Sequence, residues 1–383
     1  MRSCDMPYDR MDHGGNVYAA ARTANRSLNE LVDFSASINP LGLPASVQRA
    51  IRHGLSRAIH YPDPDQRELR RALSEYHGVD PARLVLGNGS IELIYALPRA
   101  LGIRHALILG PTFSEYERAL RAAGGQCSYV HASSSSGYAP PLRKACRLLR
   151  RQDATASGPA RSRHPSIPSF DAVFVCQPNN PTGQALTHRE ITRLYDVAAG
   201  AGAWLIVDEA FIDFCKQRSV IEEIERWPRL VLLRSFTKVY AMPGLRIGYA
   251  IAHHTVIERL RAVLPPWSVN VVAEQAALAA LKDESYRWRS LKLIDHERDK
   301  MLDRLQRVPE LRVIPSSANF LLFELLKGSA SRLTALLLEH GIVIRDCTNI
   351  PGIRTQALRI AVRTPADNAR LFRALSAAFR KPM

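Results

Sequence analysis

The chain has 383 residues, of which 46% are hydrophobic and 23% charged, and this is enough for two or three domains with substantial cores. Its formal net charge of +16 would favour anionic small molecules, whereas nucleic acid is not an expected partner, because the arginines are dispersed and form no recognisable binding module. The six cysteines are scattered and include no CxxC pair, which predicts a protein of the reduced cytoplasm without a metal cluster. No apolar run reaches membrane-spanning length, and the N-terminus lacks the apolar core of a secretory leader, so we expect a cytoplasmic protein without a membrane span.

The N-terminal part of the chain is irregular at first and then helical. Residues 1–30 are polar apart from a short predicted helix at 17–22, and 33–43 is an extended stretch that contains an Asn-Pro turn. Apolar residues at helical spacing predict two helices, at 44–59 and 66–77, on either side of a Tyr-Pro-Asp-Pro turn.

The middle of the chain alternates short apolar strands with helices. It opens with a strand at 84–86, a Gly-Asn-Gly-Ser turn and a helix from Ser90 to residue 101, and such a turn presents backbone N–H groups to an anion. Further strands are expected at 106–109, 126–131, 172–176, 204–207, 230–233 and 248–252. This alternation predicts a mostly parallel sheet between helices, with ligands bound at the carboxyl ends of the strands.

The chain changes character at two later places. Residues 152–169 are rich in Pro, Ser, Ala and Arg and lack an apolar face, so we expect a mobile surface insertion there. The strongly helical stretch 271–307 predicts a long interdomain helix that is broken once. Strands at 312–315, 320–324, 342–345 and 358–362, with helices at 329–340 and 366–380, then predict a smaller α/β domain.

Three polar residues lie at the carboxyl ends of successive strands of the predicted sheet. They are Asn180, Asp208 and Lys238. A lysine among small hydroxyl residues, with Arg246 eight residues later, is suited to form a Schiff base with a carbonyl cofactor. Singly, these residues are equally compatible with a turn asparagine, a capping aspartate and a solvated loop lysine. Their order and spacing together favour one binding site.

Pyridoxal 5′-phosphate is a carbonyl cofactor whose requirements match these segments. Lys238 can supply the amine, Asp208 can hold the pyridinium proton, and Asn180 can donate to the 3′-oxygen. The phosphate can be bound by the Gly89 turn, Ser90, Ser235 and Arg246, while Phe113 can lie against the ring. Taken alone, a phenylalanine such as Phe113 is more often an ordinary core residue, and such a glycine turn is more often a structural one.

Three motifs carry a resemblance to a known family. The motifs Asn180-Pro181-Thr182-Gly183, Asp208-Glu209-Ala210-Phe211 and Ser235-Phe236-Thr237-Lys238 with Arg246 resemble the aspartate-aminotransferase-like, fold-type I group of pyridoxal-phosphate enzymes. The resemblance covers nearly the whole chain. It implies an α/β fold with a large cofactor-binding domain at 46–270. A smaller α/β domain would be formed by both chain ends, with an N-terminal arm at 1–45 and the interdomain helix and C-terminal small domain at 271–383.

Other stretches resemble one branch of that family. His13-Gly14-Gly15, residues 33–42 and Ile344-Arg345-Asp346-Cys347-Thr348-Asn349 are most similar to the threonine-phosphate decarboxylases of cobalamin biosynthesis, which are related to histidinol-phosphate aminotransferases. This resemblance implies decarboxylation of O-phospho-L-threonine to (R)-1-amino-2-propanol phosphate. The implied substrate contacts are His13, Gly14, Asn39, Arg345 and Arg359. It stays open which arginine would take phosphate and which carboxylate, and an aminotransferase acting on a phosphorylated amino compound is the alternative.

Two single residues add to this resemblance. Related aminotransferases usually carry Tyr after Asp-Glu-Ala, but here the residue is Phe211, so Asn180 is expected to be the sole side-chain donor to the 3′-oxygen. The change favours a decarboxylase over a standard aminotransferase. Tyr61 resembles a family tyrosine that crosses a homodimer interface to the neighbour's cofactor phosphate, although it could equally be a turn aromatic that packs on Pro62.

Overall fold

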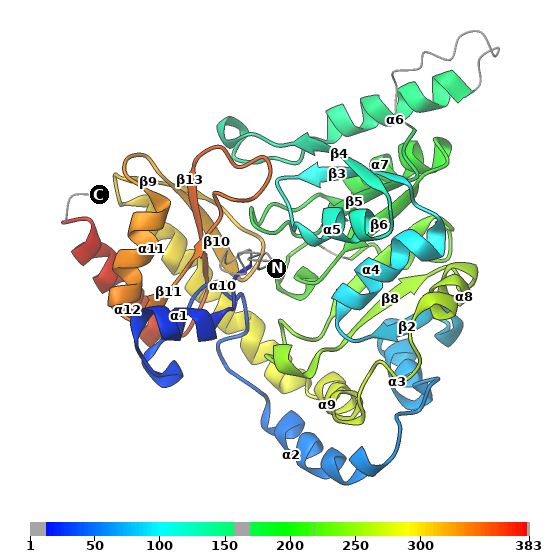
Figure 1. The fold of residues 1–383 in the computed structure, drawn as a ribbon, viewed down its shortest axis with the longest axis horizontal. Helices are drawn as coiled ribbons and strands as arrows, with labels where there is room; N and C mark the ends of the chain where they lie inside the picture. Colours follow the sequence, from blue (N-terminus) through cyan, green and yellow to red (C-terminus); the bar gives the residue numbers. More distant parts are fainter. Residues whose placement is uncertain (1–12, 157–168, 218, 381–383) are drawn as a thin grey trace, which may run out of the picture.

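The structure, a computed structural model, describes residues 13–156, 169–217 and 219–380. Its larger part is built on a seven-stranded sheet with the order β2-β8-β7-β6-β5-β3-β4 (Figure 1). These strands are β2 (Leu84–Gly87), β3 (His105–Gly110), β4 (Gln126–His131), β5 (Ala172–Cys176), β6 (Trp204–Asp208), β7 (Leu230–Ser235) and β8 (Gly248–Ala252). Because β8 is antiparallel to both of its neighbours and the other pairs are parallel, the predicted mostly parallel sheet is confirmed.

Apolar side chains cover both faces of this sheet. Along β6, Leu205 and Val207 belong to one buried cluster and Ile206 to the other. The Ile206 cluster includes residues of α4 (Ser90–Leu101), α5 (Glu115–Ala122) and α8 (His254–Val263). The Leu205 cluster includes residues of α2 (Ala45–Gly54), α3 (Arg67–His77), α6 (Leu142–Ala156), α7 (His188–Gly200) and α9 (Val271–Leu281). Burial on both faces explains why these strands are nearly continuous apolar runs in the sequence.

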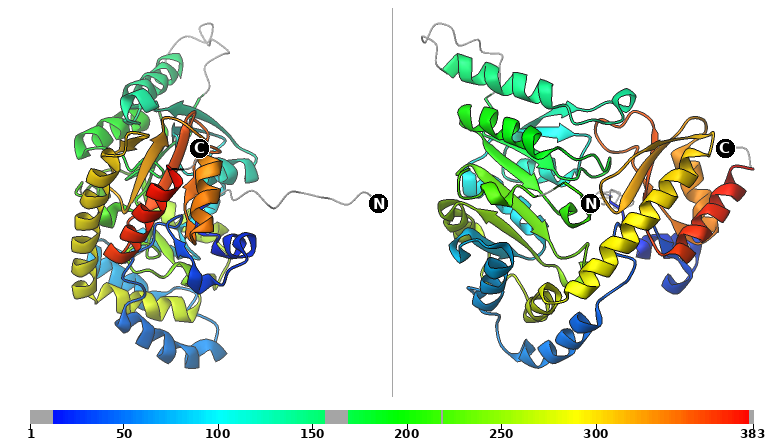
Figure 2. Two further views of the ribbon diagram at one scale, coloured as in Figure 1. Left: turned by 90° about the vertical axis from the view of Figure 1, so that its left-hand side faces the viewer. Right: turned by 180° about the vertical axis from the view of Figure 1, so that it is seen from behind.

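The smaller part is an antiparallel sheet of order β12-β13-β10-β9. Its strands are β9 (Leu311–Ile314), β10 (Phe320–Leu325), β12 (Arg345–Asp346) and β13 (Gln356–Ala361). A separate parallel pair joins β1 (Val32–Asp33) to β11 (Ile342–Val343), so both ends of the chain contribute to this part. In Figures 1 and 2, α1 (Val17–Ala24), α11 (Ala330–Glu339) and α12 (Pro365–Ala378) lie on the side of the small sheet that faces away from the large sheet.

One long helix runs along both parts of the molecule. Figure 2 shows α10 (Glu284–Gln306) extending from the region of the large sheet to the small sheet. The predicted single break in this helical stretch is confirmed. It lies between α9 and α10, where the Asp283 carboxylate accepts a hydrogen bond of 3.1 Å from the Tyr286 amide and so caps α10.

The structure differs from the sequence-based expectations at three places. The strand expected at 342–345 is two strands, because the chain leaves the pair with β1 at Val343 and joins β13 from Arg345 onward. The helix expected at 44–59 becomes a 3-10 helix from Leu55. The expected insertion at 152–169 begins as the end of α6, and residues 157–168 lie outside the described residues. In the described ranges, no helix combines the length and the apolar character that a membrane crossing needs.

Candidate active site

A cavity of about 140 Å³ lies at the carboxyl edge of the large sheet. The adjacent parallel strands β5, β6 and β7 bring the residues that follow them to this edge. The structure gathers seven of the predicted cofactor-binding residues around the cavity, namely Ser90, Phe113, Asn180, Asp208, Ser235, Lys238 and Arg246. Residues that are far apart in the sequence therefore share one site.

Asp208 is a buried carboxylate at the end of β6. The Tyr116 hydroxyl donates a hydrogen bond of 2.7 Å to its Oδ2, and the Ala210 amide donates one of 3.0 Å to its Oδ1. Burial raises the pKa of Asp208, while the bonds from Tyr116 and Ala210 and the nearby Lys238 charge limit that rise. The carboxylate is thus held in one orientation, ready to pair with a protonated group in the cavity.

Lys238 lies in the turn that follows β7, and its side chain is only partly exposed. Its Nζ is 5.5 Å from the centre of the Phe211 ring. Burial, together with the positive charges of Arg359 and Arg246, lowers the pKa of Lys238 to about 8, although Asp208 and Asp33 act in the opposite direction. A lysine with this pKa is partly neutral near neutral pH and can act as a nucleophile.

The N-terminus of α4 forms an anion cradle with Arg246. Among the residues that the structure describes, no side chain caps this helix at Gly89, so its first amide groups are available to a ligand. A Cβ on Gly89 would lie 2.6 Å from Arg246 Nη2, and a Cβ on Gly248 would lie 2.4 Å from the Ser90 amide nitrogen. Both glycines are therefore needed for this close approach.

The donors around the cavity fit pyridoxal 5′-phosphate. The cradle offers backbone amides, the Ser235 hydroxyl and a guanidinium to a phosphate group, which is the donor set that phosphates prefer. Asp208 and Lys238 lie in the same cavity, where they can meet a pyridinium nitrogen and an aldehyde carbon.

A second cavity, of about 110 Å³, adjoins the first and shares Phe113, Asn180, Phe211 and Lys238 with it. Arg345 and Arg359 line it from directly opposite positions on β12 and β13, and both are buried. Two guanidinium groups at directly opposite strand positions give this cavity donors that suit an anionic ligand. This is the physical reason to expect an anionic ligand here.

Arg359 is held firmly in this second cavity. Its Nη2 donates to the Ser35 carbonyl at 2.7 Å and its Nη1 donates to Asn180 Oδ1, while its Nε has no hydrogen-bond partner among the described residues. Arg345 Nη2 donates to Asn349 Oδ1 at 2.9 Å. The hydrogen bond from Arg359 to Asn180 connects the small sheet to the cofactor cavity, because Asn180 lines that cavity.

His13 and Gly14 also line the second cavity. His13 Nε2 is 2.6 Å from Glu115 Oε1, and Tyr95 donates to the other oxygen of the same carboxylate at 2.7 Å. Burial tends to raise the pKa of Glu115, but the bonds from His13 and Tyr95 and the Arg118 charge lower it to about 2. A Cβ on Gly14 would lie 2.0 Å from the Ser35 carbonyl oxygen, so only glycine fits there.

Three predicted site residues do not line these cavities, namely Gly89, which precedes Ser90 in the cradle, Asn39 and Tyr61. Asn39 is buried, and its amide nitrogen donates to the Val239 carbonyl at 2.6 Å and to Ser290 Oγ at 2.7 Å. It supports the chain next to Lys238 and does not line the predicted substrate cavity, because its donors are used within the core. Tyr61 is 80% exposed and packs on Trp267, with a ring separation of 5.0 Å, so it contributes nothing to the cavity of its own chain.

Sequence reasoning did not single out Tyr116 or Glu115. Both lie on α5, Glu115 two and Tyr116 three residues beyond Phe113, and both contact predicted site residues through their side chains. The sequence did contain an indication of these two residues, because a helix that starts shortly after Phe113 directs one of its faces towards the same cavity. The contacts themselves depend on how α5 packs on the sheet.

The chain is similar to known proteins over nearly its whole length. The family model described as aminotransferase class I and II matches residues 29–375. A threonine-phosphate decarboxylase of Salmonella typhimurium is 35% identical over 365 residues, which cover 95% of each chain.

Solved structures agree with this match. A histidinol-phosphate aminotransferase from Clostridium acetobutylicum superposes with a TM-score of 0.81 at 30% identity and covers 91% of this chain and 98% of its own. An L-threonine-O-3-phosphate decarboxylase from Porphyromonas gingivalis superposes with a TM-score of 0.76 at 26% identity, with coverage of 91% and 99%. Relatives with two different activities thus share this fold.

Proposed function

Because this chain belongs to the class I and II aminotransferase family of pyridoxal-phosphate enzymes, we propose that it decarboxylates O-phospho-L-threonine. The product would be (R)-1-amino-2-propanol phosphate, which serves cobalamin biosynthesis. The observation that carries the proposal is the pair of buried arginines, Arg345 and Arg359, in a cavity next to Lys238. Such a pair suits a substrate that brings both a phosphate and a carboxylate.

Pyridoxal 5′-phosphate, when bound, supplies an electron sink for a bond that breaks at the α-carbon of an amino acid. Asp208 would hold a proton at the ring nitrogen, in the orientation that Tyr116 and Ala210 impose on its carboxylate. Ser235, Arg246 and the first amides of α4 would anchor the phosphate. These contacts keep the reacting carbon beside Lys238.

The substrate's orientation decides which bond breaks. A decarboxylase would have to hold the substrate so that the carboxylate, and not the α-hydrogen, is the group that leaves. Arg345 and Arg359 would grip the two anionic groups with planar guanidinium forks and fix that orientation. After carbon dioxide leaves, Lys238 Nζ can deliver a proton to the substrate's α-carbon, because its pKa of about 8 allows it to carry and release one.

Amino transfer is the second candidate. It is favoured by the histidinol-phosphate aminotransferase from Clostridium acetobutylicum, whose TM-score is higher than that of the decarboxylase structure. Both activities would use a phosphorylated amino compound. Phe211, which offers no hydroxyl next to the cavity, supports the decarboxylase.

Product analysis separates the two activities. The purified protein is incubated with pyridoxal 5′-phosphate and O-phospho-L-threonine, and the product is identified by mass spectrometry. We expect loss of carbon dioxide and a mass that matches aminopropanol phosphate. Lys238→Ala is the inactive control. Amino transfer from glutamate that depends on 2-oxoglutarate, with no carbon dioxide released, would instead assign the protein to the aminotransferases.

A further inference from the structure

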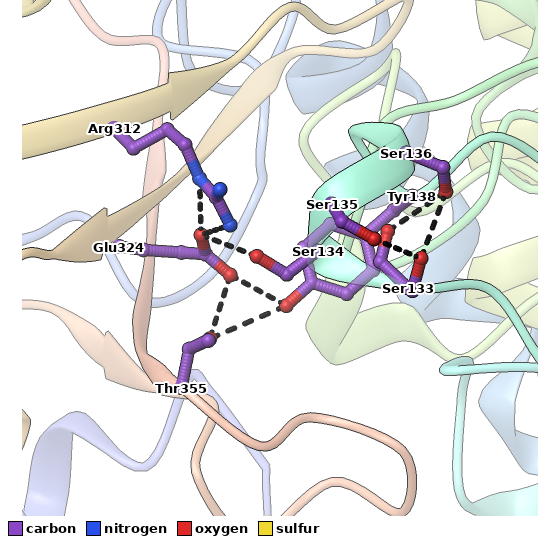
Figure 3. A network of polar contacts seen from close by, with 8 residues as sticks. All are labelled: Ser133, Ser134, Ser135, Ser136, Tyr138, Arg312, Glu324 and Thr355. Atoms are coloured by element: carbon purple, nitrogen blue, oxygen red, sulfur yellow. Dashed lines mark hydrogen bonds and ion pairs between the residues drawn. The ribbon is translucent and has the colours of Figure 1, made fainter.

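A buried carboxylate joins the two sheets at some distance from the cofactor cavity. Glu324 on β10 is 2% exposed and accepts hydrogen bonds from four side chains. Ser134, Tyr138 and Thr355 donate through their hydroxyls at 2.9, 2.6 and 2.6 Å, and Arg312 donates through Nε at 2.7 Å and through Nη2. Figure 3 shows these residues, which we call the Glu324 cluster, converging on the one carboxylate.

The cluster members come from both parts of the molecule. Ser134 and Tyr138 lie in the segment 133–138, which follows β4 of the large sheet, whereas Arg312 belongs to β9 of the small sheet. Apolar contacts support the same junction, because Ala132 and Tyr138 share a buried cluster with residues of the small part, namely Ile314, Leu322, Cys347, Ile353 and Ala357. The junction is therefore a packed interface with a satisfied charge at its centre.

Thr355 links this junction to the substrate cavity. It is the last residue of the loop 347–355, which connects β12 to β13. The same loop carries Asn349, which accepts the bond from Arg345, and Ile350, which lines the second cavity. The hydrogen-bond partner of Arg345 and a lining residue of the second cavity thus belong to one short loop, whose far end is tied to Glu324.

The middle of that loop is also pressed against the large sheet. A Cβ on Gly352 would lie 2.1 Å from Nδ1 of His131, the last residue of β4. Gly352 has φ +94°, so glycine is favoured there for its backbone conformation as well as for space. The loop 347–355 is consequently fixed to the large sheet at its middle and, through Glu324, at its end.

We propose that Glu324 is a positioning residue of the substrate site. By tying the loop 347–355 to the segment 133–138, it keeps Asn349 and Ile350 where Arg345 and the second cavity need them. This inference depends on the proposed function in one respect, because it takes the second cavity as the binding site of the phosphorylated substrate. In chemical terms, the cluster keeps the loop in its binding-competent conformation before the substrate arrives.

The test uses Glu324→Gln in the cofactor-loaded enzyme. Loss of the charge weakens the bonds from Arg312 and the hydroxyls, so the loop will populate conformations that cannot bind substrate. Apparent affinity falls by the fraction of competent protein, and we expect KM for O-phospho-L-threonine to rise roughly tenfold with kcat nearly unchanged. Hydrogen exchange of the amides in 347–355 should become faster, and the cofactor absorbance should stay the same.

Glu223→Gln is the matched control. Glu223 is also buried and pairs with Arg226 at 2.5 Å and His188 at 3.2 Å, but none of these residues lines either cavity. It should change neither KM nor the exchange of 347–355. A loss of stability alone would affect both variants, so a KM effect confined to Glu324→Gln marks a positioning role.

A second variant covers the case in which Glu324→Gln does not fold. Ser134→Ala combined with Tyr138→Phe removes two donors from the large-sheet side and leaves the pair with Arg312 intact. It should raise KM and loop exchange in the same direction. Unchanged exchange of 347–355 in a folded variant of either kind would overturn the proposal.

If the wild-type protein does not turn over O-phospho-L-threonine, the proposed function fails, and the exchange experiment still decides whether Glu324 holds the loop.

Discussion

Lys238 is surrounded by opposing charges. Arg359 and Arg246 disfavour its protonated form, Asp208 and Asp33 favour it, and burial tips the balance towards the neutral amine. An ordinary lysine is almost fully protonated at neutral pH and is a poor nucleophile. Here the same arginines that suit anionic ligands also activate the lysine, so anion binding and amine reactivity depend on one set of residues.

This pKa predicts how fast the cofactor attaches. Above its pKa the Lys238 amine is neutral and reactive, and below it the amine is protonated, so the rate of covalent attachment should rise with pH and reach half of its maximum near pH 8. Stopped-flow absorbance after mixing cofactor-free protein with pyridoxal 5′-phosphate measures the rate. A midpoint close to pH 10 would contradict the assignment, as would a covalent adduct on Lys238→Ala after borohydride reduction.

Tyr116 gives a prediction for Asp208. Tyr116→Phe removes the 2.7 Å hydrogen bond and leaves a buried carboxylate short of one donor. A bond to a charged group contributes about 1.5–3 kcal/mol, so cofactor affinity should fall by roughly ten- to a hundredfold. The pKa of Asp208, already raised by burial, should rise further. Cofactor binding requires the ionised form, and the affinity should therefore decline at a higher pH than in the wild type.

Absorbance titration with cofactor at several pH values measures this effect. Tyr195→Phe is a suitable control, because Tyr195 is also buried and stacks on Trp227 at 4.3 Å without lining either cavity. If Tyr116→Phe and Tyr195→Phe bound the cofactor equally well over the whole pH range, Tyr116 would have no role in holding Asp208.

The three central residues of the site could be predicted from their place at the end of a buried strand or in the segment that follows it. Asn180, Asp208 and Lys238 were recognisable because parallel strands deliver their C-terminal residues to a common edge. Tyr116 and Glu115 could not be derived in this way, because they act from a helix and depend on how that helix packs. Asn39 shows the opposite case, since its motif is recognisable but its side chain is used inside the core.

At the scale of elements, apolar runs predicted the strands of the large sheet well, because helices cover both of its faces. The order of these strands could not be predicted, since it depends on crossovers and not on local sequence. The switch from β11 to β12 was missed for a related reason. Residues 342–345 look like one strand, and only the positions of β1 and β13 divide them between two sheets.

The approach of α4 to β8 is the element contact on which the proposed phosphate binding depends. Gly248→Ala would place a Cβ 2.4 Å from the Ser90 amide nitrogen and 2.9 Å from the Arg234 carbonyl oxygen, both of which are backbone atoms. The start of α4 must then move, at a cost of about 1–3 kcal/mol in the free energy of unfolding. Because the cradle moves with it, the increase in Tm on adding cofactor should shrink as well.

Thermal unfolding with and without pyridoxal 5′-phosphate measures both quantities. Gly200→Ala is the control, because a methyl group added to this residue at the end of α7 would meet nothing within 4 Å. This variant should keep the full stabilisation by cofactor. An equally large cofactor-induced increase in Tm in Gly248→Ala would show that the cradle tolerates the displacement of α4.

At the scale of the whole molecule, one surface is unusually apolar. Leu55, Ile59 and Tyr61 are 59%, 82% and 80% exposed within seven residues of chain, and Trp267 packs beside Tyr61. Large side chains exposed this closely together are typical of a surface that another chain covers. We infer that two copies associate through this region, and the resemblance of Tyr61 to the family tyrosine predicts that it reaches the cofactor phosphate of the other copy.

Subunit mixing tests this homodimer directly. Tyr61→Ala should weaken cofactor binding by roughly tenfold or more, as expected for losing a hydrogen bond to a charged group, and Lys238→Ala should be inactive. In a mixed dimer, one site combines Lys238 of the first variant with the intact Tyr61 of the second. Co-expressed variants should therefore be more active at limiting cofactor than the two separately purified proteins combined, because the shared site exists only when each subunit completes its neighbour. Sedimentation as a monomer, or no gain in activity on co-expression, would exclude this arrangement. A gain in activity would place Tyr61 in the cofactor site of the neighbouring subunit, although it does not line the cofactor cavity of its own subunit.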